Sequence, residues 1–300
     1  MEYHITTALR HQAYKLVFIC LCSSLVVIID SMISKYSHNS LIWIDLESPK
    51  EEEILYVIEE YSIPSSLVEE IRKKASKSKT KISSDVIFLS LNFPKILHDE
   101  NKVLDNKIIF IISENFIMTI HDEQIDALNE FLNNLEMDTT LPEELKITNN
   151  GLLLFYLIKS LYINLKEQLV VNNTEIKELE GKIIGIKKKN ISKSIYNKNY
   201  ILIKIDQCLN SHGRIFDYLK ESLVRVYGEK FEYYTSLIKN EYSETKDMVT
   251  EQGKNFVNLY NISNLMLIDQ NSKKLKLLTR LSILSLIIVI LTFLYVFSNI

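Results

Sequence analysis

The last twenty residues of the chain, from Leu281 to Ile300, contain no charged side chain. A helix of about 20 apolar residues is long enough to cross the hydrocarbon core of a bilayer. Four cations, Lys273, Lys274, Lys276 and Arg280, come directly before this stretch. The length and the lack of charge predict one transmembrane helix over residues 277–300. Positively charged flanks stay on the cytoplasmic side of a membrane, so the four cations are expected there. The N-terminal part is then expected in the cytoplasm and the helix in the plasma (inner) membrane.

A second apolar segment, Leu16–Ile29, is too short for a span and follows Arg10 and Lys15. Such a pattern is typical of a signal peptide, although no small-residue cleavage site is clear. A span here would place the four later cations outside, against the positive-inside rule. We interpret residues 1–31 as an apolar N-terminal extension that a start at Met32 would leave out. A buried or interfacial helix stays open as the alternative.

The composition narrows the class of protein. The net charge of -3 argues against a nucleic-acid partner. The low Gly and Pro counts, 6 and 4 in 300 residues, favour long helices. Cys20, Cys22 and Cys208 do not suggest a disulfide framework. No phosphate loop or paired metal-ligand motif occurs, so we do not expect an enzyme.

Residues 32–149 mix strand and helix signals and predict an α+β cytoplasmic domain. Leu41–Leu46 is rich in strand formers. In the helix that follows, Ser48 is expected to cap and Pro49 to take the first helical position. Further strands are expected at Asp85–Phe93 and in a hairpin of Lys107–Ile112 with Phe116–His121, and further helices at 65–77 and 123–136.

From Gly151 onward apolar residues recur at helical spacing and no strand signal competes. Residues 150–229 predict a long helical hairpin, with breaks near Ile186–Ser194 and Val226–Phe231. A last helix from about Lys230 to Phe297, roughly 68 residues and about 100 Å long, would comprise a stalk over 230–276 and most of the transmembrane segment. One isolated helix cannot bury its own sides, so a homo-oligomer is expected.

Three stretches together resemble the CorA family of divalent-cation transport proteins. They are "LIWIDLESPKEEEILYVIEEYSIPSSLVEEI", "IIFIISENFIMTIHDEQIDALNEFL" and "NSKKLKLLTRLSILSLIIV". The resemblance implies a CorA-like funnel, that is, a pentamer whose first spans line a pore and whose cytoplasmic domains bind Mg²⁺ and close it. It implies Mg²⁺ as both transported and regulatory ion, with Co²⁺, Ni²⁺ and Zn²⁺ open. The partners are then further copies of the chain, the lipid bilayer and divalent cations.

The chain departs from the family pattern at the outer end of the span. The family signature Gly-Met-Asn usually follows a Tyr, whereas Tyr295 is followed by Val296, Phe297 and Ser298. A second span is also not seen. We therefore expect a truncated or degenerate member that conducts poorly alone. A non-conducting accessory subunit and a single-span scaffold protein stay open as alternatives.

The candidate pore-lining residues offer neutral oxygens, which suit a hydrated Mg²⁺ ion. They are Asn271, Thr279, Ser282 and Asn299. Bonding of the two hydroxyls to their own helix is the structural alternative, as is a solvated or frayed position for each Asn.

A regulatory metal site would need carboxylates facing each other across a subunit boundary. The candidates are Asp247, Glu251 and Asp269 on the stalk, with Asp99 and Glu100 on the α+β domain. An ordinary solvated carboxylate is the alternative for each. The basic run from Arg72 to Lys81 lacks interleaved aromatics, so we expect a solvated helix end and loop. His121 is expected to be a hydrogen-bonded structural residue.

Overall fold

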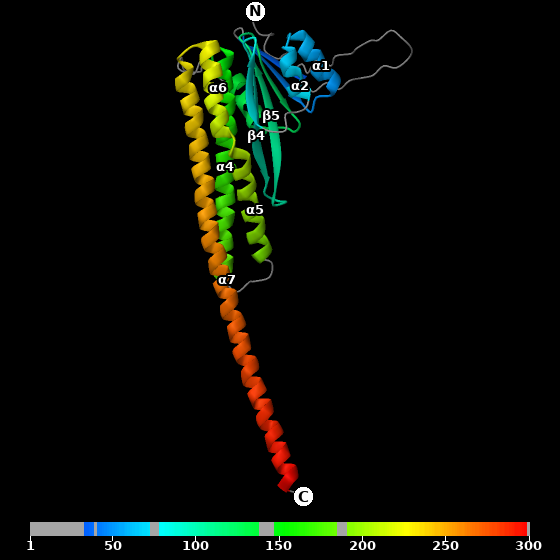
Figure 1. The fold of residues 1–300 in the computed structure, drawn as a ribbon, viewed down its shortest axis with the longest axis vertical. Helices are drawn as coiled ribbons and strands as arrows, with labels where there is room; N and C mark the ends of the chain where they lie inside the picture. The colour runs from blue at the N-terminus through cyan, green and yellow to red at the C-terminus, as the bar shows by residue number, and fades with distance from the viewer. Residues whose placement is uncertain (1–32, 39–40, 73–77, 138–146, 185–190, 299–300) are drawn as a thin grey trace, which may run out of the picture.

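The computed structural model describes residues 33–38, 41–72, 78–137, 147–184 and 191–298. The predicted N-terminal extension, residues 1–31, lies outside these ranges. An α/β head and a bundle of long helices lie side by side at one end of the molecule (Figure 1). The last helix continues far beyond both and carries the C-terminus away from the head.

The head contains one sheet of six strands in the order β1-β2-β6-β5-β4-β3. The β2–β6 pair is parallel and the other four pairs are antiparallel. The predicted hairpin is confirmed as β5 and β6, closed by a backbone hydrogen bond between Ser113 and Phe116. The strands are β1 (Ile33–His38), β2 (Leu41–Glu47), β3 (Lys79–Ser83), β4 (Val86–Leu97), β5 (Lys102–Ile112) and β6 (Ile117–His121).

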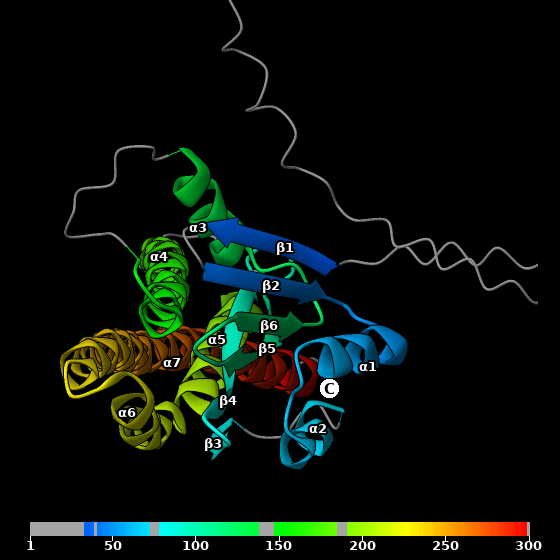
Figure 2. The same ribbon diagram turned by 90° about the horizontal axis from the view of Figure 1, so that it is seen from above.

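Each face of the sheet is covered by a different set of helices (Figure 2). Successive strand residues point to opposite faces, and on β2 Ile44 packs with one cluster while Trp43 packs with the other. Helices α1 (Glu51–Glu60) and α2 (Ser65–Arg72) cover the Ile44 face. Helix α3 (Asp126–Met137) and the long helices cover the Trp43 face. This two-sided burial explains why the central strands read as continuous apolar runs.

The start of α1 differs from the prediction. Helix α1 begins at Glu51 with Lys50 at the N-cap, and the Lys50 amide donates to the Glu53 carboxylate at 2.8 Å. Ser48 instead has a φ of 46° and donates its hydroxyl to the carbonyl of Asp122. Ser48 therefore bonds the end of β2 to the β6–α3 connection, and Pro49 lies outside the helix.

Two strands were not predicted, and both lie at the edges of the sheet. β1 and β3 are short and polar, as edge strands commonly are. Lys79 and Lys81 of the basic run therefore lie on β3, not in a loop. Their side chains bind the Glu70 carboxylate and the Ser66 carbonyl of α2. Strands β4 and β5 also run longer than predicted.

The helical region forms one bundle in which α4 and α7 run parallel. The helices are α4 (Asn150–Ile184), α5 (Ile191–Leu209), α6 (His212–Tyr227) and α7 (Phe231–Ser298). The second arm of the expected hairpin is divided into α5 and α6 at Asn210 and Ser211. The break predicted near Val226–Phe231 is confirmed, and Gly228 makes that turn with a φ of 90°. The other predicted break falls largely outside the described residues.

Candidate functional site

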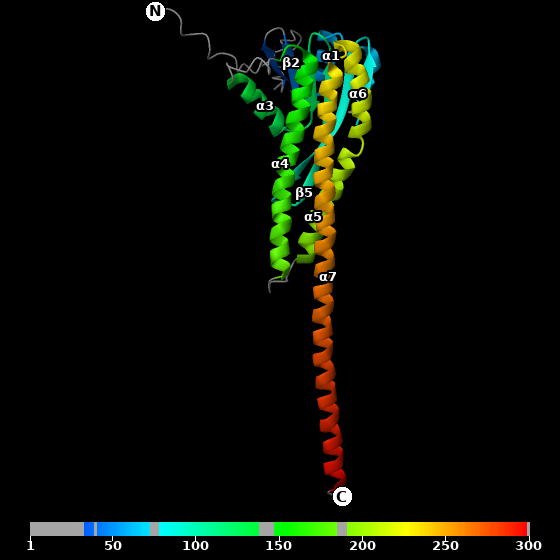
Figure 3. The same ribbon diagram turned by 90° about the vertical axis from the view of Figure 1, so that its left-hand side faces the viewer.

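Helix α7 has 68 residues and two halves of different character. In the upper half, residues that recur every three or four positions are buried against the bundle: Phe231, Thr235, Ile238, Thr245, Val249, Gln252, Phe256 and Leu259. From Asn271 to Val296 every residue is exposed. The lower half stands free of the rest of the chain (Figure 3).

The upper half of α7 is attached to three neighbouring helices by polar side chains. Lys166 of α4 contacts Glu241 at 2.5 Å, and Asp206 of α5 contacts Lys246 at 2.6 Å. Asp217 of α6 contacts Lys239 at 2.6 Å. Partly exposed pairs of this kind contribute little each, but together they oppose rotation of α7 within the bundle. The direction in which the lower half points is therefore set by the bundle.

The lower half is long and apolar enough to cross a membrane by length and composition. Its most apolar 18-residue window has a mean hydropathy of 2.5, and none of that window is buried. Leu281, Ile287 and Phe293 illustrate the exposure, at 53%, 47% and 63%. An uncovered apolar surface of this size is unfavourable in water. Lipid, further copies of the chain or both must cover it.

Polar residues of the lower half gather on one side of the helix. At about 100° per residue, Ser282, Ser285 and Thr292 lie within about 60° of Asn271 around the axis. Thr279 lies at about 80°, at the edge of this polar face. We use "polar face" for Asn271, Thr279, Ser282, Ser285 and Thr292.

The cations before the span lie mostly on the other side. Lys273, Lys276 and Arg280 are between about 140° and 180° from Asn271. Lys274, at about 60°, lies on the same side as Thr292, before the apolar stretch begins. From Leu281 onward this side of the helix carries no formal charge.

The hydroxyls of the polar face bond to their own helix. Thr279 donates to the Leu275 carbonyl at 2.9 Å, Ser285 to Ser282 at 2.8 Å and Thr292 to Val289 at 2.8 Å. For Thr279 this is the structural alternative raised from the sequence. A hydroxyl that donates its proton still has lone pairs on its oxygen. The polar face can therefore offer neutral acceptor oxygens to a cation or its water shell.

Sequence reasoning selected Asn271, Thr279 and Ser282 but missed Ser285 and Thr292. Their signal was available, because the two residues follow Ser282 by three and ten positions and thus share its side of a helix. The predicted pore residue Asn299 lies outside the described residues.

The five candidate metal-binding carboxylates are not brought together within one chain. Asp247 and Glu251 lie exposed on α7, one turn apart. Asp269 pairs with Lys273 at 2.7 Å. Asp99 and Glu100 lie at the β4–β5 turn, where Glu100 binds Lys102 at 2.8 Å. Within the described ranges, no three His, Cys, Asp or Glu side chains are grouped so as to hold a metal ion.

Other titratable groups of the head and bundle are bonded within the fold. Burial, with the hydrogen bond to Asp105, raises the pKa of the Cys208 thiol to about 12, which makes it a poor metal ligand. Burial lowers the pKa of His212 to about 3, and its Nδ1 meets the Tyr162 hydroxyl at 2.6 Å. His121 is bonded at both ring nitrogens, as expected for a structural histidine.

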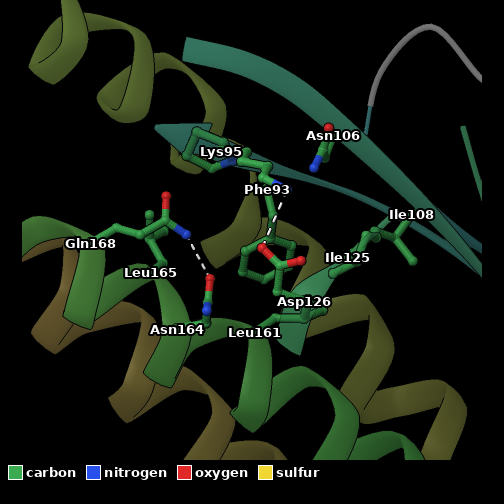
Figure 4. Close-up of a pocket in the computed structure, with 11 residues that line it drawn as sticks. Phe93, Lys95, Asn106, Ile108, Ile125, Asp126, Leu161, Asn164, Leu165 and Gln168 are labelled. Carbon is green, nitrogen blue, oxygen red and sulfur yellow. Dashed lines mark hydrogen bonds and ion pairs between the residues drawn. The ribbon is translucent and has the colours of Figure 1, made fainter. Parts of the chain in front are cut away.

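A small cavity lies between β4, β5 and α4 near the start of α3 (Figure 4). Its volume of about 30 Å³ suits a water molecule and no larger ligand. Lys95 pairs with Asp126 at 3.2 Å at its edge, and Gln168 donates to Asn164 at 2.6 Å. This cavity is part of the packing between sheet and bundle.

Several solved structures share the fold of this chain at low sequence identity. The complete CorA magnesium transporter of Methanocaldococcus jannaschii matches with a TM-score of 0.69 at 17% identity, over 81% of this chain and 75% of that one. The ZntB cytoplasmic domain of Vibrio parahaemolyticus matches with a TM-score of 0.60 at 14% identity, over 78% and 90%. Full-length CmaX matches with a TM-score of 0.66 at 9% identity, over 79% and 71%. No curated protein matches the sequence.

The family model described as CorA-like Mg²⁺ transporter protein matches residues 38–294. The match includes the head from β2 onward, the bundle and nearly all of α7, so it covers most of the chain. The family consists of membrane transporters with a soluble N-terminal domain, in agreement with the expectation that the chain is not an enzyme. The α+β domain, the long helices and the C-terminal apolar helix of this chain accordingly place it in the CorA-like Mg²⁺ transporter family.

Proposed function

We propose that the chain is one subunit of a homopentameric divalent-cation channel in the plasma membrane, with Mg²⁺ as the transported ion. The observation that carries this proposal is the lower half of α7, where one uncharged polar face runs along an otherwise apolar helix. A face of this kind suits a water-filled path better than lipid, because its oxygens can bind a hydrated ion.

Several copies are needed because one helix cannot enclose a path. In a ring of copies the polar face would turn inward, and the apolar remainder would contact neighbouring helices and lipid. The bundle supports this arrangement, since its ion pairs hold α7 at a fixed rotation. The similar structure from Methanocaldococcus jannaschii is that of a magnesium transporter, which supports the same assignment.

The chemistry of the polar face suits Mg²⁺ better than an anion. Mg²⁺ gives up its water reluctantly and is bound through oxygen ligands. Amide and hydroxyl oxygens can accept hydrogen bonds from that water without binding the ion too tightly to release. Entry would be passive, since an inside-negative potential favours each charge by about 2.3 kcal/mol per 100 mV.

Regulation would use the exposed carboxylates of the soluble part. Asp247 and Glu251 of one copy, or the paired Asp269, would meet Asp99 and Glu100 of a neighbour. Their mutual repulsion would be relieved by cytoplasmic Mg²⁺, which would hold the ring closed. Low Mg²⁺ would then allow the subunits to separate and the path to open.

The test is ion flux through the full chain reconstituted in liposomes that contain a Mg²⁺ indicator. We expect slow Mg²⁺ entry that increases with an inside-negative potential, and parallel runs with Co²⁺, Ni²⁺ and Zn²⁺ identify the ion. Asn271→Ala should change the flux several-fold. Leu277→Ala is the control, because Leu277 is also exposed but lies about 120° away, on the side opposite Thr279.

A second candidate function is that of an accessory subunit. The departure at Val296, Phe297 and Ser298 from the expected Gly-Met-Asn favours it, because those residues would form the outer mouth. In that case the chain alone gives no flux, but it changes the flux of a full-length relative in the same liposomes. Absence of flux and of any such effect would contradict both functions and favour a single-span scaffold.

A further inference from the structure

The carboxyl ends of β2 and β6, which pair in parallel, carry a buried row of polar side chains. Thr119 is fully buried, His121 is 4% exposed and the Asp45 side chain is 16% exposed. Trp43 Nε1 donates to the Thr119 hydroxyl at 2.9 Å, and that hydroxyl donates to Asp45 Oδ1. The same Asp45 oxygen lies 3.0 Å from Nε2 of His121. The row has no place in the proposed ion path.

Both ring nitrogens of His121 face atoms that can only accept a hydrogen bond. Nε2 faces the Asp45 carboxylate, and Nδ1 lies 2.7 Å from the carbonyl oxygen of Glu123. Neutral imidazole has one N–H and one lone pair, so it can satisfy only one of these acceptors. Only the imidazolium, which donates from both nitrogens, gives each of these acceptors a hydrogen bond.

The charges around the ring favour the same form. Burial by itself lowers the pKa of His121, but the hydrogen bond and charge of Asp45, the Glu123 carbonyl and the charge of Glu47 outweigh it, so the pKa is raised. The neighbour on β5 is Ile108, which carries no charge. Asp122 follows directly in the chain, and Asp126, the first residue of α3, pairs with Lys95.

The residues that His121 holds form the connection between β6 and α3. The backbone amide of Ser48 donates to the His121 carbonyl at 2.7 Å, and the Ser48 hydroxyl binds the Asp122 carbonyl. Four residues after His121, Ile125 and then Ala127 enter the core under the bundle. Ser160 of α4 donates to the Ala127 carbonyl at 3.0 Å. The first turn of α3 thus follows a connection that two side chains contact, the Ser48 hydroxyl at Asp122 and the His121 ring at Glu123.

We propose that His121 is a pH-sensitive clasp, which as an imidazolium holds the β6–α3 connection to the end of β2 and on losing its proton releases the connection and the first turn of α3. When the proton leaves, one nitrogen presents a lone pair to an oxygen lone pair. The hydrogen bond at Nδ1 is the weaker of the two, because Glu123 offers a neutral carbonyl whereas Asp45 offers a carboxylate. Because the pKa of His121 is raised, the clasp is favoured at low pH and weakened at high pH. The clasp is complete below about pH 6.5, the ordinary histidine value, and weakens as the pH rises through the raised pKa.

The experiment is hydrogen exchange of the full chain in detergent or nanodiscs, followed by mass spectrometry between pH 6 and pH 9. Rates are corrected for the intrinsic pH dependence of exchange. We expect peptides that cover residues 122–130 to lose about tenfold in protection at high pH, the scale of one buried hydrogen bond. Peptides that cover residues 245–256 of α7 are the internal control and should not change over this range.

Two variants separate titration of His121 from a general effect of pH. His121→Gln can still donate one hydrogen bond but cannot titrate, so its protection should not depend on pH. Asp45→Asn removes the neighbouring charge, so the transition should move to lower pH. Should His121→Gln not fold, the wild-type and Asp45→Asn profiles still decide. Protection of residues 122–130 that is constant with pH in the wild type, or equally pH-dependent in His121→Gln, would overturn the proposal.

Discussion

Asn172 of α4 and Gln252 of α7 form a hydrogen bond of 3.0 Å between two buried side chains. Gln252 also donates to the Leu169 carbonyl of α4 at 2.8 Å. The Asn172 side-chain N–H group donates to the Gln252 side-chain oxygen, and this buried bond favours one axial register of α7 against α4, because a shift by one turn would break it. The apolar contacts around it allow neighbouring registers more easily.

Gln252→Ala should destabilise the bundle by about 1–3 kcal/mol, since it leaves the buried Asn172 side-chain N–H group without its acceptor. The measurement is denaturant unfolding of the full chain in detergent, followed by the fluorescence of Trp43, the single tryptophan. Glu251→Ala, at the exposed neighbouring position, is the control and should change stability little. If both variants unfold alike, the buried pair is not a determinant of stability.

Acid should weaken the bundle through His212. This side chain is fully buried and neutral, with a pKa of about 3. Its unfolded pKa is about 6.5, so below that pH the unfolded state binds the proton first. The free energy of unfolding should then fall by up to about 1.4 kcal/mol per pH unit between about pH 6.5 and pH 3.

The His212 prediction is checked by unfolding at pH 7, 5 and 4. His212→Gln should reduce this slope relative to the wild type. Between pH 5 and pH 4 His121 adds little to the slope, because its pKa is raised and it is protonated there in both the folded and the unfolded state. An equal slope in the wild type and His212→Gln would refute the assignment.

Two helical glycines of α4 should respond to alanine in opposite directions. A Cβ on Gly151 would lie 2.7 Å from Cε1 of Phe231, while one on Gly181 would have no atom within 4 Å. Gly151→Ala should therefore cost about 1–3 kcal/mol through overpacking. Gly181→Ala should stabilise by about 0.5–1 kcal/mol through helix propensity. Thermal unfolding of both variants tests this, and a stabilised Gly151→Ala would show that the contact can relax.

Assembly of the chain should depend on Mg²⁺ if Asp247 and Glu251 meet carboxylates of a neighbouring copy. In detergent, millimolar Mg²⁺ should increase the fraction of pentamers seen by analytical ultracentrifugation, because the ion offsets repulsion between carboxylates. Asp247→Asn with Glu251→Gln should remove this dependence. Glu229→Gln, an exposed acidic position between α6 and α7, is the control. A strictly monomeric chain at high protein and Mg²⁺ concentration would contradict the assembly.

The extent of α7 and the mixed character of the head could be predicted because the signals are local. Apolar residues at a spacing of three and four predict a helix wherever the partner surface lies. The predicted helix from about Lys230 to Phe297 agrees with the observed Phe231–Ser298 to within one residue at each end. The span needed only length and lack of charge, and the hairpin of β5 and β6 needed only two strand-forming runs with a turn between them.

The remaining features depend on residues far apart in the chain. Strands β1 and β3 have little strand signal of their own and form because β2 and β4 offer free hydrogen-bonding edges. Ser48 and Pro49 match a helix start, but the Ser48 hydroxyl finds the Asp122 carbonyl 74 residues away. The Asn172–Gln252 and Asp45–His121 pairs join positions 80 and 76 residues apart, and no local pattern specifies such a partner.

The sequence by itself therefore determined where helices, central strands and the span lie, because periodicity and length are properties of a short window. Only the tertiary structure decided which polar groups are paired, since the cost of burying an unpaired donor or acceptor arises after distant segments have met. The tertiary structure also decided which side of the upper half of α7 packs on the bundle and which side stays exposed, because the bundle fixes the rotation of that helix.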